Sequence, residues 1–287
     1  MNTARHERRY AVLFLAPSLA GFLLFYFVPF IASFYYSLID NSISKHFVGV
    51  DNYVQLLSNP SFKQAGINTF MFTAVCVPLN LMLPLCLAIM VNQKIYSKKV
   101  LRTFFISPLV VPVASVVLVW SMIFDYRGFL NSVITAFGFK AVDWMKTDWA
   151  RVVVMVVYLW KNAGYNMVLF LAGLQNIPVE YYEWAQMEGA NLWQRFRRIT
   201  LVYLTPTLYF VFIISIINSF KVFRETYLIS GEYPHESIYM LQHYMNNVFT
   251  ALDYQKLTSA ATVMAVIVNL LVAFLFVFER KIRETIS

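Results

Sequence analysis

The sequence predicts an all-α protein that crosses a lipid bilayer six times. Its residues are 59% hydrophobic and 13% charged, whereas soluble domains are about 45–50% apolar and about 25% charged. Six stretches are each long and apolar enough to cross about 30 Å of hydrocarbon, which takes roughly 20 helical residues. Inside lipid each stretch must satisfy its own backbone hydrogen bonds, so we expect helices. The predicted spans are residues 10–37, 68–91, 103–124, 151–174, 206–229 and 257–278.

The loops between the predicted spans carry unequal numbers of basic residues. The N-terminal tail, residues 92–102, residues 175–205 and the tail after residue 278 hold thirteen lysines and arginines, and the opposite loops hold seven. Basic residues gather on the cytoplasmic side of membrane proteins. We therefore expect both termini and loop 175–205 in the cytoplasm. The outer loops are too short for separate domains, so we expect one transmembrane domain over residues 1–287.

The composition argues against several other classes of protein. The formal charge of +8 does not indicate nucleic acid, because the basic residues lie in short clusters beside apolar runs, as in proteins that contact membrane lipid. The four histidines lack metal-ligand spacing, and the chain has no phosphate-binding Gly-Lys loop and no Gly-x-Ser-x-Gly elbow. We expect no enzyme activity, no metal and no cofactor in this chain, so any nucleotide that drives it must bind another chain.

The fourth predicted span carries a stripe of polar side chains at helical spacing, on a helix that is otherwise apolar. Lys161 lies ten residues beyond Arg151, about 15 Å into the membrane, where a charge should face a cavity or a partner. Rings and amides suit a neutral, polyhydroxylated solute, so the stripe indicates a solute path. The alternative is that these side chains hold neighbouring helices together. The stripe is Tyr158, Lys161, Asn162, Tyr165 and Asn166.

The fifth and sixth spans add weaker candidates for the path. Lys221 and Glu225 are four residues apart, so an alternative is that they pair with each other near the outer surface. The middle of the six spans holds no carboxylate, which argues against an ion-coupled secondary transporter or channel. The candidates are Asn218, Lys221, Arg224, Glu225 and, on the sixth span, Asn269.

Residues 176–206 form a polar loop with local order of its own. We expect Asn176 to cap a first helix that has Pro178 in its early turn. Gly189 offers a left-handed stop to this helix. We expect Asn191 to cap a second helix that runs into the fifth span. The sequence of the loop therefore predicts a helix–turn–helix at the membrane surface.

The charges of this loop favour a docking surface for another protein. A helix that rests on lipid headgroups is the alternative, and the basic second arm would suit it. Anionic lipid would repel the acidic first arm, however. The acidic residues are Glu180, Glu183 and Glu188, and the basic ones are Arg195, Arg197 and Arg198.

The residues of the loop also follow a recognisable order. They read Leu174-Gln-Asn-Ile-Pro178, Glu180-Tyr-Tyr-Glu183-Trp-Ala185, Glu188-Gly189-Ala190, then Phe196, Ile199, Leu201 and Pro206. This order resembles the EAA loop of ATP-binding-cassette (ABC) importer permeases, and it is most similar to the six-helix carbohydrate-uptake family. Further segments agree in order, namely Phe47-Val-Gly-Val-Asp-Asn-Tyr53, Asn68-Thr69, Arg102-Thr-Phe-Phe-Ile-Ser-Pro108, Gly128-Phe-Leu-Asn131 and Ser219-Phe-Lys-Val-Phe223.

Three positions depart from the family pattern. Trp184 stands at the central alanine of the EAA triplet, and Val202 stands where a proline is expected. The usual Gly-Gly-Pro after the fifth span is Gly231-Glu-Tyr-Pro234. These departures concern fine details of contact and not the family.

The resemblance implies a type I ABC importer permease fold with a cytoplasmic coupling helix, in a bacterial or archaeal cell (inner) membrane. It implies a second permease, two ATP-binding subunits that hold ATP and Mg, and an extracytoplasmic sugar-binding protein. The solute would be a sugar or oligosaccharide; the alternative is another solute of the same superfamily, such as a glycerophosphodiester. The implied ATPase-coupling residues are Glu180, Glu183, Trp184, Ala185, Glu188, Gly189 and Ala190, and the candidate path residues are Tyr158, Lys161, Asn162, Tyr165, Asn166, Asn218 and Asn269.

Overall fold

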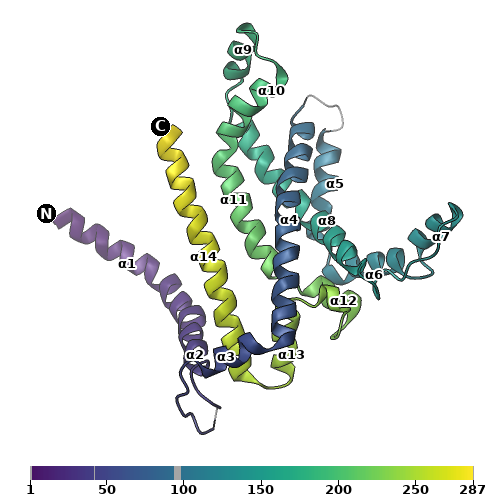
Figure 1. Ribbon diagram of the computed structural model, residues 1–287. Helices are drawn as coiled ribbons and strands as arrows, with labels where there is room; N and C mark the ends of the chain where they lie inside the picture. The colour runs from purple at the N-terminus through teal and green to yellow at the C-terminus, as the bar shows by residue number, and fades with distance from the viewer. Residues whose placement is uncertain (1, 42, 94–97, 287) are drawn as a thin grey trace. The chain divides into compact units, whose positions relative to one another are not determined.

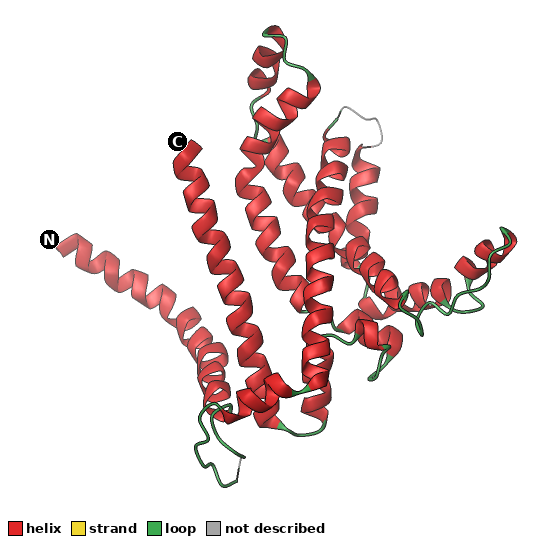
Figure 2. Ribbon diagram, in the orientation of Figure 1, coloured by secondary structure: helices red, strands yellow, loops and turns green. Residues whose placement is uncertain are grey.

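The computed structural model describes residues 2–41, 43–93 and 98–286, and its regular elements there are helices apart from one isolated bridge between Ile39 and Phe47 (Figures 1 and 2). Among the described residues, six helical stretches are long and apolar enough to cross a membrane. The predicted class and number of spans are therefore confirmed. The stretches are Val12–Tyr36, Pro60–Asn92, Val113–Ala136, Ala150–Gln175, Leu192–Ser230 and Tyr254–Val277.

Two predicted spans are divided between helices. Residues 103–124 fall partly in α5 (Lys98–Val110) and partly in α6 (Val113–Phe124), because Pro112 has no N–H to continue a helix and stands at ψ 135°. Residues 206–229 fall in α11 (Leu201–Phe220) and α12 (Arg224–Ser230), and the backbone between these two helices is unwound. The second break contains no proline, and it lies beside the polar cavity described below.

The chain forms two compact units, Met1–Pro60 with Met245–Ile267, and Ser61–Tyr244 with Val268–Ser287. Within the first unit, Asn52 closes the turn that follows the first span. Its side-chain Nδ2 donates to the carbonyl oxygens of Ser37 at 2.9 Å and Ile39 at 2.8 Å. The hydroxyls of Ser37 and Tyr53 lie 2.6 Å apart, so α3 is tied to the end of α2. The helical elements that begin in this unit are α1 (Asn2–Phe22), a π-helical turn (Leu23–Phe27), α2 (Val28–Tyr36), α3 (Asp51–Ser58) and α14 (Tyr254–Ile286).

The second unit is organised around α8 (Ala150–Gln175). Met167 and Phe170 of α8 are fully buried and pack with Ala88 of α4 and with Leu204 and Val211 of α11 in one apolar core. The helix therefore contacts partners on several sides. The remaining helical elements are α4 (Pro60–Asn92), α7 (Phe129–Ala136), α9 (Val179–Met187), α10 (Leu192–Arg195), a π-helical turn (Phe196–Thr200), a 3-10 turn (Glu236–Ile238) and α13 (Leu241–Thr250).

Two glycines allow neighbouring helices to approach α8 closely. A Cβ placed on Gly164 would lie 1.7 Å from the carbonyl oxygen of Phe105 in α5. A Cβ on Gly173 would lie 2.7 Å from Cδ2 of Leu204 in α11. The first contact is with backbone, which cannot rotate away, so Gly164 sets the distance between α5 and α8.

We expect Gly164→Ala to lower the free energy of unfolding by about 1–3 kcal/mol or more, as overpacking does in tightly packed cores. Thermal unfolding of the purified protein in detergent measures the change. The matched control is Gly66→Ala on α4, where a Cβ would meet nothing within 4 Å. Equal unfolding temperatures for the two variants would contradict the close contact between α5 and α8.

His243 is buried among aromatic rings outside the membrane spans. It lies in α13 and is 0% exposed. Its ring centroid lies 4.9 Å from that of Phe223, 6.1 Å from Tyr239 and 6.4 Å from Tyr227. Neither ring nitrogen has a hydrogen-bond partner among the described residues. Burial lowers the pKa of His243 from 6.5 to about 4, so the ring is neutral at pH 7.

Acid should therefore destabilise the packing around α13. As the pH falls below 6.5, the unfolded chain binds a proton at His243 before the folded chain does, so stability decreases until the folded-state pKa of about 4 is reached. We expect His243→Phe to reduce this decrease, measured as unfolding temperature against pH. The control His46→Phe leaves His243 in place and should retain the decrease. Identical pH profiles for His243→Phe and the unmodified protein would refute this role of His243.

Candidate solute path and coupling loop

Four residues of the predicted path surround one cavity of about 230 Å³. The cavity lies where the fifth span is broken, between Phe220 at the end of α11 and Arg224 at the start of α12. Irregular backbone at membrane depth is tolerated where it lines a cavity or is buried in protein. Lys221 and Val222 of the unwound backbone line this hollow, as expected for irregular backbone in a membrane span. Its lining residues are Tyr158, Lys161 and Asn162 of α8, Asn218 of α11, Lys221 and Val222 of the break, and Glu225 of α12.

Lys161 and Glu225 form an ion pair at this cavity, through Nζ and Oε1. Their side chains are 30% and 12% exposed, so the pair is partly shielded from solvent. The alternative pairing of Lys221 with Glu225 is wrong. The unwound backbone after Phe220 removes the continuous helix that would bring residues four apart onto one face, and Glu225 pairs with α8 instead.

A buried hydrogen-bond network lies beside the cavity and joins three helices. Asn166 Nδ2 donates to the carbonyl oxygen of Asn80 at 3.1 Å and lies 3.4 Å from Ser215 Oγ. Asn80 Nδ2 lies 3.3 Å from Ser215 Oγ, and the Tyr158 hydroxyl donates to the Ser215 carbonyl at 3.3 Å. Asn166 therefore holds helices together in this structure, which was the alternative reading of the polar stripe.

The sequence analysis did not predict a role for two members of the network, Asn80 and Ser215. Each is a single polar residue on an apolar span, and such residues show no periodic pattern. Asn80 is 1% exposed and Ser215 is 0% exposed. An amide or hydroxyl group in lipid without a hydrogen-bond partner is unfavourable. On this ground, the sequence analysis could have predicted that each of these residues has a partner on another helix.

Asn162, one of the four cavity residues, and two further path candidates occupy different environments. Asn162 is half-buried at the cavity wall, and its Nδ2 donates to the Tyr158 carbonyl at 2.8 Å. Tyr165 is 37% exposed, and it is not among the residues that line the cavity. Asn269 lies exposed on α14 and does not line the cavity either. The cavity therefore brings together Tyr158, Lys161 and Asn162 of the stripe and the break in the fifth span.

The loop between α8 and α11 forms two arms joined by a tight turn. Gly189 adopts φ +78°, which confirms the predicted left-handed stop. Asn191 Oδ1 accepts from Gln194 N at 2.9 Å, and Gln194 Oε1 accepts from Asn191 N at 2.8 Å, which confirms the predicted cap. The predicted cap at Asn176 is wrong. Asn176 ends α8, and Pro178 stands at the N-cap of α9, because α8 continues through Gln175.

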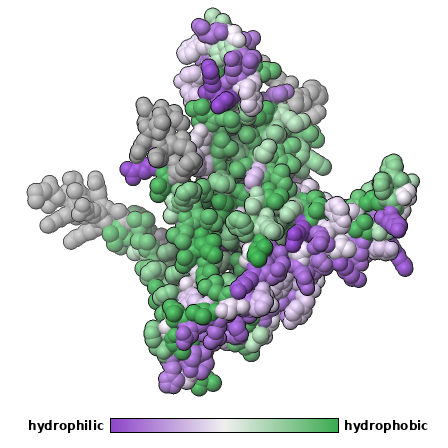
Figure 3. All heavy atoms as spheres, in the orientation of Figure 1, coloured by the Kyte–Doolittle hydropathy of each residue, from purple (hydrophilic) through white to green (hydrophobic). Residues whose placement is uncertain are grey.

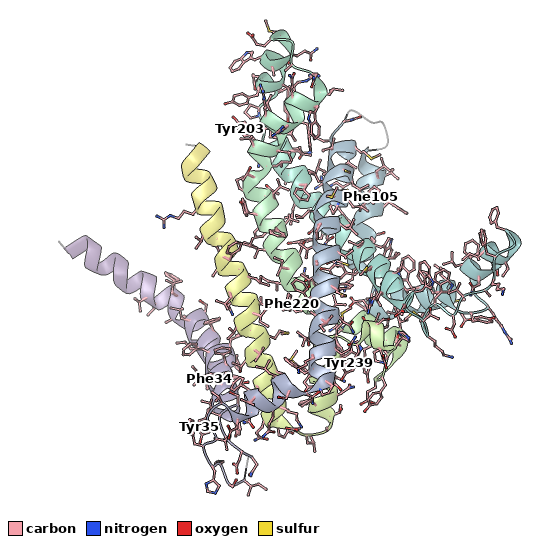
Figure 4. All side chains as sticks on the ribbon, viewed as in Figure 1. Phe34, Tyr35, Phe105, Tyr203, Phe220 and Tyr239 are labelled. Carbon is pink, nitrogen blue, oxygen red and sulfur yellow. The ribbon has the colours of Figure 1, made fainter. Side chains whose placement is uncertain are left out.

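Side-chain contacts tie the two arms to each other and to α11. The hydroxyls of Tyr182 and Thr200 lie 2.9 Å apart, and Arg195 Nη1 donates to Gln186 Oε1 at 3.0 Å. The rings of Tyr181 and Tyr203 lie 5.1 Å apart. Figure 4 labels Tyr203 at the end of α11 near this loop and Phe220 at the other end. The loop is therefore braced against the base of α11.

The outer surface of the loop carries large apolar side chains next to acidic ones. Trp184 is 62% exposed, Met187 is 85% exposed and Trp193 is 65% exposed. Helix α9, which is described throughout, buries none of its residues. Figure 3 shows hydrophilic residues gathered over α9 and α10, above the hydrophobic surface of the helices. Exposed apolar groups within a polar surface are typical of protein interaction sites.

A groove of about 340 Å³ lies between the arms, next to this surface. Of the residues that the sequence assigns to ATPase coupling, Ala185, Glu188, Gly189 and Ala190 line the groove, while Glu180, Glu183 and Trp184 lie exposed on α9. The remaining lining residues are Gln194, Arg195, Arg198 and Ile199.

Six apolar spans, one of them broken at a polar cavity, and a braced, exposed loop agree with the class of transmembrane permeases. The chain belongs to the family of binding-protein-dependent transport system inner membrane components, which matches residues 67–284. The chain is thus an ABC transporter permease subunit and a multi-pass membrane protein. The resemblance of loop 175–205 to the EAA loop agrees with this family.

Relatives cover most of the chain. The arabinooligosaccharides transport system permease protein AraP of Bacillus subtilis (strain 168) is 36% identical over 227 residues, which are 76% of this chain and 71% of AraP. The lactose transport system permease protein LacF of Rhizobium radiobacter is 34% identical over 280 residues, 95% of this chain and 93% of LacF. A crystal structure of a bacterial ABC transporter involved in import of the acidic polysaccharide alginate matches with a TM-score of 0.86 at 24% identity, covering 98% of this chain and 99% of that one. This likeness establishes the type I importer permease fold.

Proposed function

We propose that this chain forms half of the membrane path by which a sugar or oligosaccharide enters the cell, driven by ATP hydrolysis on a separate chain. The observation that carries the proposal is the polar cavity at the break in the fifth span, set in helices that also hold the coupling loop. The relatives AraP and LacF are named for arabinooligosaccharide and lactose transport, which supports a carbohydrate as solute.

The chemistry of the cavity suits hydroxyl groups. Side-chain amides such as Asn162 and Asn218 both donate and accept hydrogen bonds, as a sugar hydroxyl does. We assign solute contact to Lys161, Asn162 and Asn218, and we assign Tyr158 and Asn166 to the wall that supports them. Tyr165 and Asn269 remain predicted path residues that would act at other stages of transport.

The Lys161–Glu225 ion pair reduces the positive charge of the cavity lining. Lys161 would attract a phosphate if it were unpaired, but its charge is compensated by Glu225. Lys221 has no ion pair among the described residues, and it stands at the C-terminal end of α11, where a cation complements the helix dipole. Our proposal of a neutral, hydroxylated solute therefore rests on the amides of Asn162 and Asn218 and on the carbohydrate relatives, and a glycerophosphodiester stays the alternative.

The partners follow from the exposed surfaces and the family. We place loop 175–205 and both termini in the cytoplasm, where the exposed face of α9 docks on one of two ATP-binding subunits that hold ATP and Mg. A second permease completes the path in a heterodimer. An extracytoplasmic sugar-binding protein delivers the solute, as suggested by a structure of the alginate transporter in complex with an alginate-bound periplasmic protein.

The coupling mechanism is mechanical. Closure of the ATPases moves α9, and the bracing contacts of Tyr182 and Arg195 pass this motion to the second arm. That arm continues through the π-helical turn into α11 without interruption. Since α11 ends at the cavity, motion of the loop changes the shape of the path and exposes it alternately to the two sides.

We expect Glu183→Arg to leave membrane insertion intact but to weaken assembly with the ATPase at least about tenfold, as at an interface hot spot. ATP-driven sugar uptake should be lost with it. Co-purification of the ATPase and uptake into proteoliposomes measure the two effects. Asp143→Arg, the same change of charge on loop 125–150, is the matched control and should assemble normally. A Glu183→Arg protein with its full ATPase complement and normal uptake would refute the assignment.

A further inference from the structure

Helix α7 (Phe129–Ala136) has an apolar face that the protein covers only in part. On one edge of this face, Leu130 and Ile134 pack against a core that contains Trp144. Phe129 and Val133 form the other edge, one turn apart, and they are 69% and 36% exposed. The described residues therefore leave the second edge open to its surroundings.

The position of α7 in the chain brings this edge to the surface of the membrane. Four residues separate Phe124, the end of α6, from α7, so α7 begins within about 18 Å of the end of a membrane span. Figure 1 shows α7 beyond the end of α6 and away from α4 and α11. Tyr126 and Trp149, next to the ends of α6 and α8, are exposed, as aromatic residues are at the level of lipid headgroups. The coupling loop lies at the other end of α8, so α7 meets the leaflet away from that loop.

The charges around α7 are complementary to phospholipid. Between residues 126 and 142 the charged side chains are Arg127 and Lys140, and the stretch contains no carboxylate. Both cations are exposed, and neither has an ion pair among the residues that the structure describes. Cations beside an exposed apolar edge are typical of helices that lie among lipid headgroups.

The polar edge of α7 satisfies its own hydrogen bonds. The Ser132 hydroxyl donates to the carbonyl oxygen of Gly128 at 3.0 Å, and the Thr135 hydroxyl donates to that of Asn131 at 2.7 Å. These hydroxyl donors therefore need no partner from another protein. A poorly hydrated headgroup region is tolerated by such a helix.

We propose that α7 is an interfacial anchor that binds the leaflet away from the coupling loop. Phe129 and Val133 enter the boundary between headgroups and acyl chains, and the exposed Phe137 continues this edge beyond the helix. Arg127 and Lys140 bind lipid phosphates. The covered edge of α7 packs in one core with residues of α8 and α12, so lipid bound to α7 also holds the ends of these two helices.

The experiment compares two edges of the same helix. Val133→Cys and Thr135→Cys are made separately in a background with the exposed Cys86 replaced by serine, and each is labelled with a small fluorophore. The complete transporter is reconstituted in phosphatidylcholine vesicles, with or without bromine on the acyl chains near the headgroup. We expect bromine to quench the Val133→Cys label by about half or more, because this edge enters the lipid. Thr135→Cys, about 160° away around the helix, is the matched control and should be quenched at least about twofold less.

Three results would overturn the anchor. Equal quenching of the two labels by brominated lipid would mean that α7 has no preferred edge toward the membrane. A Val133→Cys label that is quenched by aqueous iodide but not by brominated lipid would place this edge in water. Protection from both quenchers, in the transporter alone or after addition of the binding protein, would assign the edge to a protein partner instead of lipid.

A second comparison tests the lipid phosphates. With bromine carried only by phosphatidylglycerol in a mixture with phosphatidylcholine, Lys140→Gln should reduce quenching of the Val133→Cys label about twofold. Lys146→Gln is the matched control on the same loop, because its ammonium already lies 3.8 Å from the Asp143 carboxylate, and it should leave quenching unchanged. Equal effects of the two substitutions would overturn the contact assigned to Lys140.

Discussion

The second unit depends on a small polar network buried in apolar surroundings. Asn80 of α4, Tyr158 and Asn166 of α8 and Ser215 of α11 bond to one another where neither water nor lipid offers an alternative partner. Helix association in membranes gains little from the hydrophobic effect, because lipid tails are as apolar as the helices. These hydrogen bonds, with the close approach at Gly164, therefore fix which faces of the helices meet.

The network lies between the loop and the polar cavity along α8 and α11. Helices α8 and α11 flank the coupling loop at one end and border the polar cavity further along. Lys161 lies fourteen residues before Gln175, about 21 Å along α8. Because the network joins α8 and α11 between these points, we propose that a displacement of the loop moves both helices together. Such a rigid pair transmits motion better than two helices that slide independently.

Structural features that depend on neighbouring residues could be predicted from the sequence. Contacts between residues far apart in the chain could not. The apolar runs predict six spans, and Gly189 and Asn191 mark the turn of the loop, because each effect involves only neighbouring residues. The predicted N-cap at Asn176 is wrong because α8 continues to Gln175. Asn176 therefore caps the C-terminal end of α8 and does not begin the next helix. The break at Lys221–Phe223 contains no proline, so no residue in the sequence predicts it. The Lys161–Glu225 pair joins residues that are 64 apart in the chain, which no local pattern indicates. Asn80 and Ser215 acquire their role only when three helices meet.

The most direct test of this account asks whether the coupling loop and the cavity move as one. In the complete transporter, a cysteine at position 218 is labelled with and without a non-hydrolysable ATP analogue, first with Asn166 intact and then with Asn166→Leu. The account predicts that the nucleotide changes the labelling rate in the first protein. It predicts that the change is lost or reduced in the second, although the ATPase stays bound. An undiminished response to nucleotide in the Asn166→Leu protein would contradict the account.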